Sequence, residues 1–114
     1  MTIQERSVGS VVVLDLSGRL VLGDGEALLK DTVAGLLKQG RRQVLLNMSD
    51  VSYVDSSGIG VLVGSSLNAK GTGGAVKLLN PSKRVHDALS LARLLPMLEV
   101  CSSEADARHS FDAR

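Results

Sequence analysis

The stretch that most constrains this chain is a polar break at Asp55, Ser56 and Ser57, between an apolar run and a helical pattern. Before the break, residues 43–48 have the length and aliphatic content of a strand that is covered on both faces. After it, side chains recur at the spacing of one mainly apolar helix face, which we expect to point inward: Ile59, Leu62, Val63, Ser66 and Leu67. The pattern therefore predicts a buried strand that leads into a helix, with both serines at the helix start.

A helix start gives Ser56 and Ser57 two alternative roles. The first turn of a helix presents unpaired backbone N–H groups and the positive end of the helix dipole. A serine at this point commonly caps the helix, and a phosphate group is also stabilised there. The residue types alone leave both roles open.

The opposite side of the same helix is predicted to have low relief. If the apolar face points inward, Val61, Gly64, Ser65 and Asn68 lie on the outer side, next to Ser56. Gly60 and Gly64 stand four residues apart and remove side chains from neighbouring turns. The missing side chains would allow either close packing of the helix on a sheet or close contact with a partner protein, and both interpretations stay open.

The strands of the chain predict a mixed sheet. We expect strands near residues 3–7, 11–16, 75–79 and 97–100, in addition to the buried run, with Gly18 ending the second of them. The first two strands are close enough to form an antiparallel hairpin. A strand–helix–strand unit follows, and its right-handed crossover gives parallel pairing.

The helices complete an α/β order. Asp24 is placed to cap the first helix, and the second is expected over residues 57–70. Pro81 suits the first turn of a third helix that ends near residues 92–94, and Ser103 opens a closing helix. The chain is predicted to be one domain over residues 1–114, in the order β-β-α-β-α-β-α-β-α, with helices packed on a mixed sheet.

Composition excludes several classes of function. A formal charge of +1 provides no field that would attract nucleic acid or an anionic membrane, so we expect no direct nucleic-acid binding. Cys101 is the one cysteine, which excludes an internal disulfide and a cysteine-based zinc site and fits a reducing compartment. No run approaches the roughly 20 apolar residues of a membrane span, and the start lacks the features of a signal peptide. We expect a cytoplasmic protein.

No catalytic, metal or cofactor site is predicted. Gly58, Gly60 and Gly64 follow a strand, as glycines do in dinucleotide-binding turns, but the acidic residue expected about 20 positions later is missing. His86 and His109 have no metal-ligand spacing. A triad of Ser56, His86 and Asp55 lacks the Gly-x-Ser-x-Gly elbow that exposes a nucleophile. An independent enzyme is therefore not expected.

Residues 53–62, YVDSSGIGVL, preceded by residues 45–48 and followed by Gly73 and Gly74, resemble the signature of STAS-domain anti-sigma factor antagonists. The resemblance extends over roughly residues 11–100. It implies the STAS-like fold. It also implies that Ser56, the serine directly after the aspartate, is phosphorylated by an anti-sigma factor that is itself a serine kinase of the histidine-kinase-like ATPase type.

The resemblance further implies a partner surface and a reset step. The unphosphorylated protein binds the kinase, phosphorylation releases it, and a serine phosphatase restores the first state. The surface expected to bind the partner consists of Asp24, Asp55, Ser56, Ser57, Gly58, Gly60, Val61 and Gly64. One departure concerns the loop before the first helix, where this chain carries Val21 and Leu22 ahead of Asp24. The alternative implied by the same family is a stable scaffold subunit of a stress-signalling or transport complex, with Ser56 as a helix cap only.

Overall fold

The structure, a computed structural model, describes residues 1–112 of the chain. Its strands and helices follow the predicted alternation, and a short 3₁₀ helix precedes the last strand. In chain order they are β1 (Thr2–Val8), β2 (Val11–Leu20), α1 (Glu26–Lys38), β3 (Gln43–Val54), α2 (Ser56–Gly71), β4 (Ala75–Leu79), α3 (Lys83–Leu91), η1 (Leu95–Met97), β5 (Glu99–Cys101) and α4 (Glu104–Asp112).

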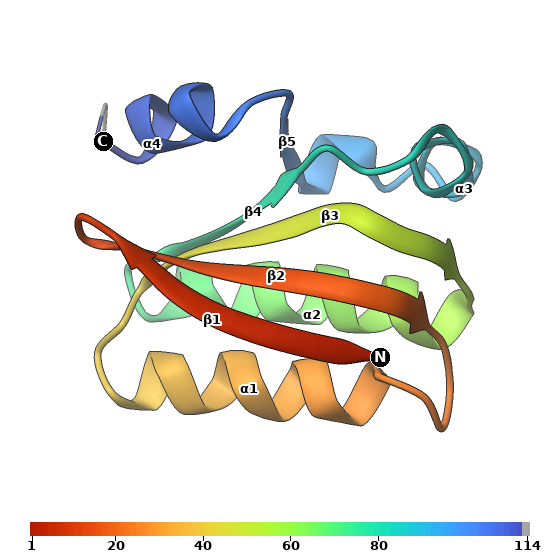
Figure 1. Ribbon diagram of the computed structural model, residues 1–114, viewed down its shortest axis with the longest axis horizontal. Helices are drawn as coiled ribbons and strands as arrows, with labels where there is room; N and C mark the ends of the chain where they lie inside the picture. Colours follow the sequence, from red (N-terminus) through yellow and green to blue (C-terminus); the bar gives the residue numbers. More distant parts are fainter. Residues whose placement is uncertain (113–114) are drawn as a thin grey trace.

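The strands form one sheet in the order β1-β2-β3-β4-β5. β1 and β2 pair antiparallel as a hairpin, and all later pairs are parallel. Figure 1 shows α1 and α2 side by side on one face of the sheet and α3 and α4 on the other. The predicted α/β class, the hairpin and the mixed sheet are therefore confirmed.

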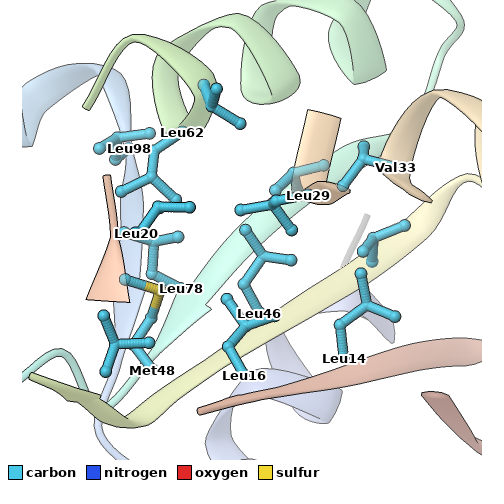
Figure 2. Close-up of a cluster of buried hydrophobic side chains, with 14 of the residues drawn as sticks. Leu14, Leu16, Leu20, Leu29, Val33, Leu46, Met48, Leu62, Leu78 and Leu98 are labelled. Atoms are coloured by element: carbon cyan, nitrogen blue, oxygen red, sulfur yellow. The ribbon is translucent and has the colours of Figure 1, made fainter. Parts of the chain in front are cut away.

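The main core lies between the sheet and the pair α1 and α2. Leu29 and Val33 of α1 and Leu62 of α2 point at sheet residues that include Leu14 and Leu46, as Figure 2 shows. Each of these side chains is almost completely buried. At about 25 cal/mol per Å² of apolar surface removed from water, this layer supplies most of the drive for folding.

A smaller cluster lies under α4 and contains a buried charge. Lys77 in the middle of β4 is only 2% exposed. Its Nζ donates to Ser110 Oγ, lies 3.0 Å from Glu99 Oε2 and sits 4.5 Å from the centre of the Phe111 ring. A buried ammonium is tolerated only when it is paired in this way. The polar contacts and Phe111 together fix α4 to the sheet.

Two strands continue further than their sequence predicts. β2 passes through Gly18, which adopts a φ of +114°, and ends at Leu20, so the expectation that Gly18 ends the strand is wrong. β3 continues past residue 48 to Val54, and its register against β2 shifts twice. Such bulges insert extra residues and bend a strand. The polar positions among residues 49–53 therefore belong to a bent strand that ends next to Asp55.

Three smaller predictions at element ends are also wrong. α1 begins at Glu26 after Gly25, whose φ is +104°, and Asp24 makes no capping bond to the helix. Pro81 lies before α3 rather than in its first turn, because Ser82 caps that helix by accepting from Val85 N–H. The last strand is Glu99–Cys101 rather than residues 97–100. At α4, Ser103 accepts from the N–H of Asp106 as expected.

The inward face of α2 differs from the predicted one. Its buried positions are Gly58, Val61, Leu62, Ser65, Ser66 and Ala69, whereas Leu67 is 52% exposed. The prediction that Val61 and Ser65 face outward is therefore wrong. The reason is that α2 is covered on two sides, by the sheet and by α1, so small residues as well as large ones are buried. Within residues 1–112, no helix is long and apolar enough to cross a membrane.

Candidate functional site

Asp55 organises the junction where β3 meets α2. Its Oδ1 accepts from Gly58 N–H at 2.9 Å, which is the capping bond of α2. Its Oδ2 accepts from Leu22 N–H at 3.0 Å, and its own N–H donates to Leu20 O at 3.3 Å. The carboxylate of Asp55 therefore joins the loop after β2 to the start of α2, and its backbone N–H adds a bond to the end of β2. The interpretation of Ser56 or Ser57 as the cap is wrong, because Asp55 takes that role.

These bonds also set the charge state of Asp55. The Leu22 N–H, and after it the Gly58 N–H, hold the pKa of the Asp55 carboxyl below its ordinary value. Hydrogen bonds to the ionised form favour that form. The junction thus carries a fixed negative charge next to Ser56 at neutral pH.

We expect Asp55→Asn to destabilise the fold in a pH-dependent way. Asparagine keeps an oxygen for Gly58 but places an NH₂ group where Leu22 N–H needs an acceptor. Because the folded pKa of Asp55 is lowered, its stabilising contribution is present above the unfolded value of about 3.9 and is lost as pH falls through the folded pKa. Urea unfolding of both forms should show a gap at pH 7 that narrows below about pH 4. A gap independent of pH would contradict this assignment.

The two serines differ in exposure. Ser56 is the first residue of α2 and is exposed, and within residues 1–112 its hydroxyl has no hydrogen-bond partner. Ser57 is half-buried and faces the space between α1 and α2. The side chain of Ser56 is thus the more exposed of the two to an approaching protein.

Gly58 and Val61 do not offer a surface to a partner. Gly58 is buried, and a Cβ atom added to it would lie 2.1 Å from Leu20 O. Only glycine lets the start of α2 approach the end of β2 so closely. Val61 is 8% exposed and reaches the surface only in the groove between α1 and α2. The expectation of direct partner contact by these two residues is corrected to a role in packing.

Gly60 and Gly64 are exposed, and their lack of a side chain is not explained by packing. A Cβ atom added to either would meet nothing within 4 Å. Close helix–sheet packing is therefore the wrong reading of these glycines. Each costs the helix about 1 kcal/mol relative to alanine. They leave a low, open strip on α2 beyond Ser56.

The loop between β2 and α1 lies beside the same junction. Leu22 is bonded to Asp55 through its backbone, and its side chain is 70% exposed. Asp24 is bonded to the N-terminal ammonium of Met1, with 2.6 Å between N and Oδ1. Sequence reasoning noted Val21 and Leu22 only as a departure and did not predict that Leu22 would stand exposed next to Ser56. The sequence signal for an exposed Leu22 was its position, a large apolar residue directly before Gly23 and Asp24 in a loop.

The described residues form neither a metal site nor a catalytic triad around Ser56. Residues 1–112 contain no group of three or more His, Cys, Asp or Glu side chains that could hold a metal ion. His86 is exposed on α3 with Nδ1 3.9 Å from an oxygen of Asp87, while Asp55 is bonded to backbone N–H groups. The triad of Ser56, His86 and Asp55 is therefore not formed.

Comparison with known proteins gives a consistent picture. The family model described as STAS domain matches residues 2–107. The anti-sigma-B factor antagonist of Bacillus subtilis is 33% identical over 72 residues, which cover 63% of this chain and 65% of that protein. The crystal structure of a candidate anti-sigma factor antagonist from Thermotoga maritima has a TM-score of 0.90 and 26% identity, over 96% of this chain and 94% of that one.

The fold also matches one relative in two covalent states. The unphosphorylated form of the anti-sigma factor antagonist SpoIIAA has a TM-score of 0.72 and 20% identity, over 96% of both chains. Bacillus SpoIIAA in its phosphorylated form has a TM-score of 0.73 and 23% identity, over 96% of this chain and 99% of that one. At these identities the likeness concerns the fold.

Proposed function

The chain belongs to the STAS-domain family, and from that membership and the geometry of Asp55 and Ser56 we propose that it is an anti-sigma factor antagonist switched by phosphorylation of Ser56. In the unmodified state it binds an anti-sigma factor. That partner is a serine kinase of the histidine-kinase-like ATPase type, which phosphorylates Ser56 and is then released. A serine phosphatase resets the protein, and the cycle takes place in the cytoplasm, where sigma factors act.

The observation that carries the proposal is the exposed, unused hydroxyl of Ser56. Because Asp55 caps α2, esterification of Ser56 removes no capping bond. Because the side chain is exposed, a kinase can reach it without unfolding the domain. The equal match to both forms of SpoIIAA supports a modification that leaves this fold in place.

The partner surface is centred on Ser56 and uses the exposed residues around it. Leu22 supplies an apolar contact, and Gly60 and Gly64 let a partner backbone come close to α2. Ser57 and Asp55 border the modified residue, and Asp24 lies on the neighbouring loop. A few well-packed residues near the centre of an interface usually carry most of the binding energy.

Phosphate incorporation tests the proposal at residue level. Incubation of the chain with its cognate kinase and ATP should place one phosphate on Ser56, located by mass spectrometry of the digested protein. Ser57→Ala should still be labelled, since Asp55 rather than Ser57 caps α2. Ser56→Ala should not be labelled but should still bind the kinase. Label on Ser57, or none in the wild type with a kinase that binds it, would contradict the switch and favour the scaffold role.

A further inference from the structure

Lys77 is the one charged side chain that is buried within residues 1–112, and its burial depends on α4. Its Nζ donates to Ser110 Oγ and lies against the ring of Phe111, and both residues belong to α4. Its third contact is Glu99 of β5, whose side chain is 61% exposed and therefore already in water. Without α4, the ammonium of Lys77 would be open to water as well.

The charge of Lys77 is not required by the strand that carries it. All five residues of β4 are buried, and the other four are one alanine, one valine and two leucines. Parallel strands that are covered on both faces usually consist of aliphatic residues throughout. Replacing a buried ionic group by an apolar one of similar volume is often neutral or stabilising, because desolvation of the charge can exceed what its contacts return. A lysine at this position therefore lowers the gain from covering the strand.

α4 itself is attached by few buried side chains. Of its nine residues, only Ala107 and Phe111 are buried. Glu104 at its start pairs with Arg6, but this ion pair is exposed, and exposed pairs contribute little. By contrast, α1 contributes four large aliphatic side chains to the main core. The docking of α4 must offset the conformational entropy of an ordered helix with one large apolar side chain.

We propose that α4 is a strap that leaves the sheet as a unit while the rest of the fold stays intact. The main core supports this separation, because it lies between the sheet and the pair α1 and α2, on the face opposite to α4, and none of its described residues belongs to α4 (Figure 1). Opening of the strap returns Lys77 to water and uncovers the apolar strip of Val13, Leu45 and Leu79. The fold thus contains a second surface that is closed while α4 is docked. The strap does not depend on phosphorylation of Ser56.

Hydrogen exchange of the backbone amides tests the strap. In native buffer, the amides of residues 108–112 should exchange at least about tenfold faster than the slowest amides of α1 and β3, because they open without the core. Urea well below the unfolding midpoint should barely change the rates in α4, since a local opening exposes little surface, but it should accelerate the slowest amides of α1. Rates in α4 that rise with urea as steeply as those in α1 would contradict the strap, because α4 would then open only when the whole domain unfolds.

Two substitutions between α4 and the sheet should act in opposite directions. Phe111→Ala should accelerate exchange in α4 at least about tenfold, because it removes the one large apolar side chain that attaches the helix. Lys77→Met should slow exchange in α4 at least about threefold, because methionine fills a similar volume without a charge to desolvate. The amide spectrum of each variant confirms that the sheet and α1 are folded.

Val33→Ala is the matched control, because it leaves a cavity in the main core and not under α4. Val33 is 1% exposed on α1. Its truncation destabilises the docked and the open form of the strap equally, so it should accelerate the slowest amides of α1 at least about fivefold and leave those of α4 within about twofold. Equal acceleration of α4 and α1 by Val33→Ala, unchanged exchange in α4 of Phe111→Ala, or faster exchange in α4 of folded Lys77→Met would each overturn the proposal.

Discussion

Gly58→Ala lowers the free energy of unfolding by about 2 kcal/mol or more. The added Cβ would lie 2.1 Å from Leu20 O and 2.8 Å from Val54 Cγ1. The oxygen cannot move freely, because it accepts from Asp55 N–H and belongs to the last residue of β2. Overpacking costs about 1–3 kcal/mol and sometimes more, whereas alanine gains at most about 1 kcal/mol from helix propensity. The steric term therefore wins, and urea unfolding measures the difference.

Gly60→Ala is the matched control for that change. It makes the same substitution two residues later on the same helix, where the added Cβ meets nothing within 4 Å. Only helix propensity acts there, so the unfolding free energy should rise by up to about 1 kcal/mol. The two substitutions should thus have effects of opposite sign. If Gly58→Ala is as stable as Gly60→Ala, α2 does not approach β2 as closely as described.

Phosphorylation of Ser56 should weaken binding of the anti-sigma factor about a thousandfold, which corresponds to about 4 kcal/mol. The phosphate adds about −1.5 to −2 charges next to the ionised carboxylate of Asp55. Its favourable interaction with the positive end of α2 is present in the free and the bound protein and largely cancels. The desolvation of the phosphate on docking does not cancel and costs several kcal/mol unless the charge is paired.

Substitutions at Ser56 should weaken binding of the anti-sigma factor in proportion to the charge that they add. Ser56→Ala should bind within about threefold of the wild type, because the side chain makes no hydrogen bond within residues 1–112. Ser56→Asp should bind more weakly than Ser56→Ala, since it adds one charge but less than a phosphate does. Calorimetric titration of both variants with the purified anti-sigma factor gives the ratio. Equal affinities of the two would argue that charge at this position does not control docking.

Regular patterns in the sequence were sufficient for the architecture. Leu29, Val33, Leu36 and Leu37 recur at helical spacing on α1, and β4 is one continuous buried run. The hairpin of β1 and β2 follows from the short connection between two adjacent strands. α1 has one buried face and β4 is buried throughout, so the hydrophobic pattern of each reports its surroundings directly.

Hydrophobic patterns predict α2 and the end of β3 less accurately, because these segments have more than one kind of surroundings. α2 contacts both the sheet and α1, so apolar and small residues occur all round it and the inward face was assigned to Leu67 instead of Ala69. The end of β3 contains polar residues because the strand is bulged and partly exposed there. The motif identified Asp55 and Ser56, but periodicity does not reveal which side chain caps a helix when Asp and Ser stand together.

The central claim is that Ser56 carries a charge-controlled switch on an unchanged fold. The most direct measurement is a titration of one anti-sigma factor against the unmodified chain and against the same chain phosphorylated at Ser56, with amide spectra of both forms. The account predicts an affinity loss of about a thousandfold, with spectral changes confined to the β2–α1 loop and the first turns of α2. Equal affinity of the two forms, or changes throughout the sheet, would contradict it.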